Sequence, residues 1–262
     1  MRRGHISIIV GGSRGVGQAV AHVLAARGGS VFVVGRNRAR VDETVSSLAA
    51  HGPARHLGRV LDASDADAIA AMAAACVDVF GRIDLLVFSA AVSGLEEISK
   101  IPLQTLDLPV AAWRKALDVN LHGAFLANKA VLPVMIEQGE GHILNIGSAL
   151  TPHGMRGRAH AAAYSATKFA LAAFTHCLAA EASSHGIRVN VVFPGPIRTP
   201  LIEGTALAQD FGGQLTAEHF AEIVLRLLEL PADCFAADPY IMPTKVVGPT
   251  VRIRGAADGT RA

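Results

Sequence analysis

Residues 6–17 read Ile-Ser-Ile-Ile-Val-Gly-Gly-Ser-Arg-Gly-Val-Gly, and an apolar-periodic segment continues from 16 to 26. A short β-branched run that ends in glycines and leads into such a segment predicts a strand, a tight turn and a helix. Glycines permit the turn and let backbone N–H groups approach a phosphate at the start of the helix. We therefore expect a nucleotide-binding unit here, with an ordinary glycine-rich turn as the alternative.

The same alternation of strand and helix continues along the chain. Further strands are expected at 31–34, 56–61, 85–88, 143–146, 188–193 and 239–242. Further helices are expected at 41–50, from Asp62 or Ser64 to Phe80, at 111–138 with a bend at Pro133, at 159–184 and at 216–230. Uniformly apolar strands predict a parallel sheet of about seven strands with helices on both faces, a doubly wound α/β fold of the Rossmann type.

No linker divides the chain, so one domain is expected over residues 1–244. A lid over the substrate is expected near 200–215, and the aperiodic tail at 245–262 is expected to be loose. The chain has 262 residues, 18% charged, and a formal net charge of +2. No basic run interleaved with aromatic residues suggests nucleic acid, no apolar run has membrane-spanning length, and no pattern suggests a metal site.

The three cysteines are scattered along the chain, at Cys76, Cys177 and Cys234. Their odd number and spacing fit a reducing compartment better than a disulfide framework. No secretory signal is apparent at the start of the chain. A cytoplasmic protein is therefore expected.

The turn after the second strand predicts which dinucleotide is bound. A carboxylate at this place would bind the 2′-hydroxyl of NAD, but the residues are Gly35-Arg36-Asn37-Arg38. Arg14, in the glycine turn, is expected on the same side. Two guanidinium groups suit a 2′-phosphate, which favours NADP(H) over NAD(H). Solvated surface arginines are the alternative.

Tyr164 and Lys168 stand four residues apart in an expected helix, so they share one face. A lysine cation beside a phenol lowers the phenol pKa, which makes the pair a candidate acid–base device. Alone the pair is weak evidence, because this spacing often arises by chance on solvated helices.

Several further short motifs follow one another in a recognisable order. They are the glycine turn at 11–17, Asp62 after the third strand, Leu117-Asp118-Val119-Asn120, Ser148 after Asn145-Ile146-Gly147, Tyr164 with Lys168, and Pro194-Gly195 with Thr199. In this order they resemble the short-chain dehydrogenase/reductase family over residues 5–243. Within it, the segments near 227–231 and 242–244 resemble reductases of the oxoacyl-carrier-protein type.

The resemblance implies roles for individual residues. Ser148 would polarise a substrate carbonyl, Tyr164 would donate the proton, Lys168 would lower the pKa of Tyr164, and Asn120 would anchor a water in a proton relay. Asp62 would meet the adenine and Thr199 the nicotinamide carboxamide. The full set expected to bind the cofactor is Gly11, Ser13, Arg14, Gly15, Val16, Gly17, Arg36, Asp62, Ala90, Tyr164, Lys168, Pro194 and Thr199.

The sequence departs from the family pattern in three places. Val10 replaces a usual threonine, and Phe88-Ser89-Ala90-Ala91 replaces Asn-Asn-Ala-Gly. In the family, that threonine and that loop help to tie the two central strands together. Here less polar groups replace both ends of this link. Removing both partners of a hydrogen bond can leave stability nearly unchanged, so the fold is expected to survive. A glycine in this loop would let the backbone approach a cofactor closely, so the departure bears on the fit of a cofactor near Ala90. The segment between Ser148 and Tyr164 is also longer, and Arg156 or Arg158 could meet an acidic substrate group or only solvent.

These features predict an NADP(H)-dependent oxidoreductase that interconverts a ketone and a secondary alcohol. The apolar residues expected in the lid suggest an apolar or cyclic substrate. The family resemblance implies a homodimer or homotetramer built through the helices at 111–138 and 159–184. A nucleotide-binding sensor or scaffold without turnover, and an NAD(H)-dependent alcohol dehydrogenase, are the alternatives.

Overall fold

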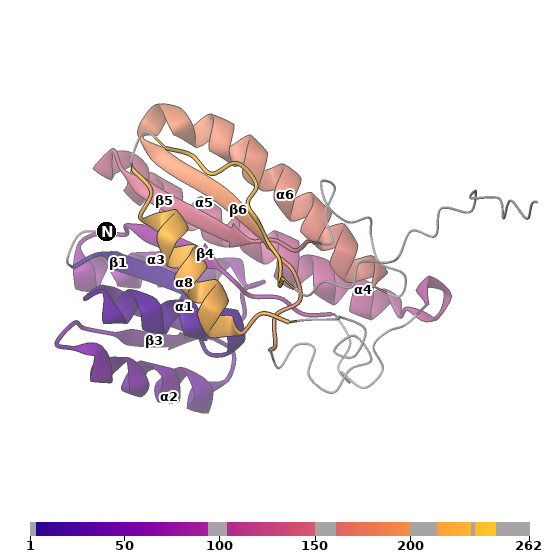
Figure 1. The fold of residues 1–262 in the computed structure, drawn as a ribbon, viewed down its shortest axis with the longest axis horizontal. Coiled ribbons are helices and arrows are strands. Elements are labelled where there is room, and N and C mark those ends of the chain that lie inside the picture. The colour runs from indigo at the N-terminus through magenta and orange to yellow at the C-terminus, as the bar shows by residue number, and fades with distance from the viewer. Residues whose placement is uncertain (1–3, 94–103, 150–160, 200–213, 232–233, 245–262) are drawn as a thin grey trace, which may run out of the picture.

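The strands form one sheet in the order β3-β2-β1-β4-β5-β6-β7, with every pairing parallel (Figure 1). This computed structural model describes residues 4–93, 104–149, 161–199, 214–231 and 234–244. The strands are β1 (Ile6–Val10), β2 (Ser30–Gly35), β3 (Leu57–Val60), β4 (Leu85–Phe88), β5 (Gly141–Ile146), β6 (Ile187–Pro194) and β7 (Tyr240–Ile241). The order reverses direction between β1 and β4, and the carboxyl ends of strands at such a switch point are where ligands bind.

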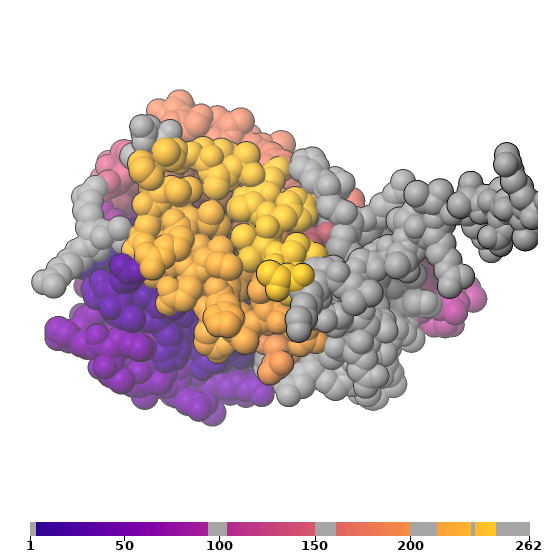
Figure 2. Space-filling view, in the orientation of Figure 1, coloured from indigo at the N-terminus to yellow at the C-terminus, as the bar shows by residue number. Residues whose placement is uncertain are grey.

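Helices cover both faces of the sheet. One face packs on α1 (Gly15–Ala26), α2 (Arg38–Leu48) and α8 (Ala217–Leu228). The other packs on α3 (Ala66–Phe80), α5 (Gly123–Gln138) and α6 (Ala162–Ala182), with α4 (Val110–Leu117) beside α6. Short turns of 3₁₀ helix lie at Ala49–His51, Thr105–Asp107 and Ser183–His185. Figure 2 shows the yellow and orange C-terminal part lying directly against the indigo N-terminal part. The doubly wound Rossmann-type fold is confirmed.

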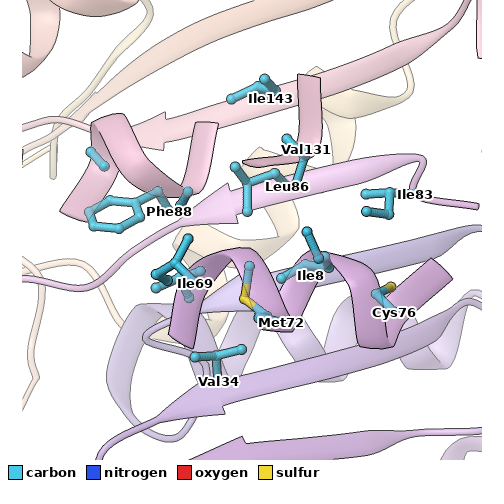
Figure 3. Packing of buried hydrophobic residues seen from close by; sticks show 14 of the residues in the cluster. Ile8, Val34, Ile69, Met72, Cys76, Ile83, Leu86, Phe88, Val131 and Ile143 are labelled. Atoms are coloured by element: carbon cyan, nitrogen blue, oxygen red, sulfur yellow. The ribbon is translucent and has the colours of Figure 1, made fainter. Parts of the chain in front are cut away.

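Apolar packing replaces the polar link between the two central strands. Val10 and Phe88 are neighbours in register, both are buried, and the Ser89 N–H donates to the Val10 carbonyl over 2.8 Å. Figure 3 shows Phe88 in the same cluster as Met72 and Cys76 of α3. Burial raises the pKa of the Cys76 thiol to about 12. This thiol is therefore unreactive and contributes only to the packing of the core. The fold survives the two substitutions, as expected.

Two helix predictions were wrong in detail. The helix after β3 begins at Ala66 and is capped by Asp65, whose carboxylate accepts from the Ala68 N–H, because Asp62 is engaged with Ser64 instead. The run at 111–138 contains a π-helical turn, Asp118–His122, that was not predicted, and Pro133 lies inside α5. Gly123 follows this turn, and a Cβ there would lie 2.8 Å from the Ala63 carbonyl oxygen. A side chain would therefore not fit at the position that follows the π-helical turn.

Several predicted features lie outside the described residues. They are the tail at 245–262, most of the lid at 200–215, and the arginines at 156 and 158. The described ends of the lid do meet, since Ile197 bridges Leu215 and the Arg198 N–H donates to the Leu215 carbonyl over 2.9 Å.

Among the described residues, the run Val110–Gln138 has the length and apolarity of a membrane span. A core helix passes the same test, and this run packs against α3 and the sheet.

The buried imidazole of His142, at the start of β5, predicts loss of stability in acid. It bonds Asn190 Oδ1 over 2.8 Å, and burial lowers its pKa to about 4 from about 6.5 in the unfolded chain. Because the folded pKa is depressed, this contribution is complete above about pH 6.5 and is lost as the pH falls to about 4. We expect it to cost about 3 kcal/mol of unfolding free energy over that interval. Denaturant unfolding at several pH values checks this, and the His142→Gln variant should lack this part of the pH dependence.

Candidate active site

Tyr164 and Lys168 lie on one face of α6, beside the carboxyl end of β5. The Lys168 side chain is 2% exposed, and its Nζ atom lies 5.7 Å from the centre of the Tyr164 ring. The ammonium donates to the Ile146 carbonyl oxygen, the last residue of β5, over 2.6 Å. Burial lowers the pKa of Lys168 to about 8. The structure thus holds a cation beside the phenol, as the spacing predicted.

Ser148 lies two residues beyond the end of β5, and its hydroxyl is hydrogen-bonded to the Tyr164 phenol. Burial raises the pKa of Tyr164 to about 12, and the hydrogen bond with Ser148 opposes that shift only in part. The lowering of this pKa by Lys168 that the sequence led us to expect is not found, because desolvation of the phenolate is the largest effect. Tyr164 is protonated at neutral pH and can donate a hydrogen bond.

Asn120 lies in the π-helical turn and ties together two segments that border the site. Its Oδ1 accepts from the Val92 N–H over 2.8 Å, and its Nδ2 donates to the Val92 carbonyl and to Thr167 Oγ1. Both amide hydrogens are thus used. A water in the predicted relay would have to be held by an oxygen of Asn120, and that role stays a prediction. Single π turns of this kind occur often at functional sites.

The glycine turn forms a cradle at the carboxyl end of β1. Gly11 has φ +86°, and a Cβ there would lie 2.6 Å from the Ala90 amide nitrogen. Gly17 faces the Gly11 carbonyl so closely that a side chain would not fit. The first N–H groups of α1 donate no hydrogen bond to the side chain at the N-cap position, Arg14. Such an uncapped helix start behind a glycine turn fits a pyrophosphate.

Three arginines gather beside this cradle, at the carboxyl end of β2. Burial and the charges of Arg40 and Arg36 lower the pKa of Arg14. None of the three guanidiniums has an ion-pair partner in the part of the chain that the structure describes. The mutual repulsion would be relieved by an anion. Ser13, whose side chain packs against Gly35, lies at the same edge.

The remaining predicted residues also lie at carboxyl ends of strands. Asp62 follows β3, and Lys115 Nζ lies 3.2 Å from its Oδ2. Burial opposes ionisation of Asp62, but hydrogen bonds from Ser64 and Lys115 outweigh it and hold the pKa below its usual value. Pro194 ends β6 and its carbonyl accepts from the Ala149 N–H over 2.8 Å. Thr199 lies just beyond it, partly buried.

Comparison with known proteins gives the family. The sequence model of the short chain dehydrogenases matches residues 5–209. The chain belongs to the short-chain dehydrogenase family.

Individual relatives agree with this assignment. A cis-4-hydroxycyclohexanecarboxylate dehydrogenase from Sinomonas cyclohexanicum is 36% identical over 227 residues, which cover 84% of this chain and 87% of that protein. A 3-oxoacyl-[acyl-carrier-protein] reductase from Synechocystis is 34% identical over 199 residues, which cover 76% of each. The crystal structure of a single-residue variant of actinorhodin polyketide ketoreductase with NADPH superposes with a TM-score of 0.80 at 29% identity, covering 91% of this chain and 96% of that one.

As a short-chain dehydrogenase, the protein is an oxidoreductase that uses a nicotinamide cofactor and interconverts a ketone and a secondary alcohol. The structure brings together Ser148, Tyr164 and Lys168. Asn120 is joined to the helix that carries Tyr164 and Lys168 by its hydrogen bond to Thr167. Sequence reasoning missed Arg40 and Lys115. Arg40 stands in the first turn of α2, four residues after Arg36 in the same basic segment, and that clustering of arginines was the available signal.

Proposed function

We propose that the protein is an NADP(H)-dependent reductase of apolar or cyclic ketones, working through Ser148, Tyr164 and Lys168. The observation that carries the proposal is the hydrogen bond between the Ser148 hydroxyl and a protonated Tyr164, with the Lys168 ammonium buried beside the ring. Two hydroxyl donors thus converge at the carboxyl ends of β4 and β5, which is where ligands bind in such a sheet.

The role of each side chain follows from where charge develops during the reaction. The bound cofactor supplies hydride to the carbonyl carbon, or accepts it in the reverse direction. Ser148 donates a hydrogen bond to the oxygen on which negative charge develops, and Tyr164 donates a hydrogen bond and then its proton. The buried Lys168 cation stabilises the phenolate that remains. Asn120 holds the segments that border this group.

The residues expected to hold the cofactor fit NADP(H). The glycine cradle and the uncapped start of α1 suit the pyrophosphate, and Asp62 suits the adenine. Among the residues that the structure describes, Arg14, Arg36 and Arg40 form a positive cluster without an acidic partner, and the turn after β2 carries no carboxylate. A 2′-phosphate, which carries charge and bidentate acceptors, relieves their repulsion. The 2′-hydroxyl of NAD(H) would not.

Direct assay tests the proposed activity. The relative that acts on cis-4-hydroxycyclohexanecarboxylate suggests its ketone, 4-oxocyclohexanecarboxylate, as a first probe, with a bicyclic ketone beside it. We expect NADPH-dependent reduction of at least one cyclic ketone, followed by NADPH absorbance, and slower reduction with NADH. Normal NADPH binding with no turnover of any ketone or alcohol would favour the sensor or scaffold instead.

The pKa of Lys168 predicts an alkaline limit to activity. Reduction needs Lys168 charged, and its pKa of about 8 means that the charge is present below that pH and lost above it. The pKa of Tyr164, about 12, lies too high to cause the same limit. We expect kcat/KM for NADPH to fall above about pH 8. A Lys168→Met variant should be slow at every pH and should not show this fall above about pH 8. If the variant still shows the fall, a group other than Lys168 causes it.

The same family membership supports a homodimer or homotetramer in the cytoplasm. Phe125 of α5 is 41% exposed, stacks on His122 and meets the Phe174 ring of α6, and Trp113 of α4 is 36% exposed. An aromatic surface across α4, α5 and α6 suits a second copy. Sedimentation of Phe125→Asp should show a smaller assembly than the natural chain, and a natural chain that is already monomeric would contradict the proposal.

A further inference from the structure

A buried amide network lies beneath the site. Asn128 of α5 and Asn145 of β5 exchange two hydrogen bonds, both 3.1 Å, between their side-chain amides. Asn145 Nδ2 also donates to Thr175 Oγ1 of α6 over 3.0 Å. Asn128 and Asn145 are 0% exposed and Thr175 is 1% exposed. Polar groups this deep in an apolar core are costly unless they are fully bonded.

Every hydrogen in this network has an acceptor. Asn128 Nδ2 gives its second hydrogen to the Ala124 carbonyl over 2.7 Å, and Asn145 Nδ2 divides its two between Asn128 and Thr175. Thr175 passes its own hydroxyl hydrogen to the Leu171 carbonyl over 2.7 Å, so its oxygen is left to accept. The direction of each bond is thus fixed. A fully satisfied buried network is rigid and specifies one arrangement of the elements that it joins.

The three joined elements are those that carry or border the proposed catalytic groups. On β5, Asn145 precedes Ile146, whose carbonyl holds Lys168, and stands three residues before Ser148. On α6, Thr175 lies two turns after Lys168 on the same face. Asn128 of α5 lies two turns after Asn120.

We propose that Asn128, Asn145 and Thr175 are positioning residues that set the end of β5 against α6, and so set where Ser148 stands relative to Tyr164. The inference rests on the proposed function of these two hydroxyl groups. Ordinary core packing against α6 would not require polar partners at this depth, whereas a directional network fixes both distance and rotation. A displacement of about 1 Å at reacting groups can cost about 10²-fold in rate.

The test is the double variant Asn128→Leu/Asn145→Leu. Leucine is close to asparagine in shape, and removing both partners together avoids leaving one amide unbonded, so the fold should persist. We expect kcat for 4-oxocyclohexanecarboxylate, or for the best cyclic ketone found, to fall about 10²-fold. KM for the ketone and Kd for NADPH should stay within about threefold, since neither binding site is touched. A kcat within about twofold of the natural enzyme would overturn the proposal.

The matched control is His142→Leu/Asn190→Leu, which removes a part-buried polar pair that joins the other end of β5 to β6. This control should leave kcat unchanged. If kcat falls as far in the control as in Asn128→Leu/Asn145→Leu, removing any polar pair along β5 slows the reaction, which contradicts a specific positioning role. Should the first double variant fail to fold, Thr175→Val removes one acceptor and is expected to lower kcat about tenfold; an unchanged kcat in that variant also overturns the proposal.

Hydrogen exchange separates failure of this proposal from failure of the proposed function. In Asn128→Leu/Asn145→Leu, the peptides that carry Ser148 and Lys168 should exchange faster than in the natural chain, while α1 and β2 stay protected. This readout needs no turnover. Unchanged exchange in both peptides would overturn the network proposal even in an active enzyme, and an inactive natural enzyme with the expected exchange would overturn only the proposed function.

Discussion

The Tyr164→Phe variant should reduce ketones about 10³-fold more slowly than the natural enzyme, because general acid catalysis by one placed group contributes about 10² to 10⁴ in rate. Phenylalanine keeps the ring that lies 5.7 Å from Lys168 Nζ and removes only the hydroxyl that bonds Ser148. Kd for NADPH, measured by fluorescence, should change by less than about threefold, so the loss should be in kcat.

Tyr240→Phe is the matched control, because the chain has two tyrosines and the other lies outside the site. Its ring stacks on Phe193 with centres 4.8 Å apart, an interaction that phenylalanine retains. This variant should keep the natural kcat. If Tyr164→Phe also keeps it, Tyr164 is not the proton donor and the proposed mechanism is wrong.

The Arg36→Ala/Arg40→Ala variant should lose NADPH affinity about 10²-fold or more, since each charge-assisted bond to a phosphate contributes about 1.5 to 3 kcal/mol. Both side chains are exposed and lie close enough to Arg14 to lower its pKa by repulsion. Kd for NADH should stay within about threefold, because NADH lacks the 2′-phosphate. Titration of both cofactors by fluorescence gives the two constants directly.

Arg38→Ala is the control on the same helix. Arg38 is exposed and stands 3.9 Å from Asp42, one turn along α2, so it already has an acidic partner. Its loss should change Kd for NADPH less than about twofold. Salt should weaken NADPH binding to the natural protein more than to the double variant. Tighter binding of NADH than of NADPH by the natural chain would reverse the assignment and favour an NAD(H)-dependent alcohol dehydrogenase.

Much of the site could be read from spacing alone. Tyr164 and Lys168 had to share a face because they stand four apart in a helix, and Gly11, Gly15 and Gly17 had to make a turn that no side chain obstructs. The parallel sheet followed from strands that are apolar on both faces. Periodicity and backbone freedom are local properties, so the sequence carries them directly.

Other features depend on what surrounds each group. The pKa of Tyr164 rises and does not fall, because burial is the largest effect on it, and burial is a property of the assembled core. The π-helical turn that holds Asn120 precedes Gly123, which lies close to the Ala63 backbone, a contact between segments far apart in the sequence. Arg40 joins Arg14 only when the end of β2 meets the glycine turn.

The sequence by itself determined the alternation of strands and helices, the glycine cradle and the placement of Tyr164 and Lys168 on one helix face, since each depends on residues close together in the chain. Only the tertiary structure decided which charges face one another and how deeply they are buried. It also brought Asn128, Asn145 and Thr175 into one network, although 47 residues separate the first from the last. Solvation and long-range contact arise only when the sheet and its helices are assembled, and they set the acidity and position of the reacting groups.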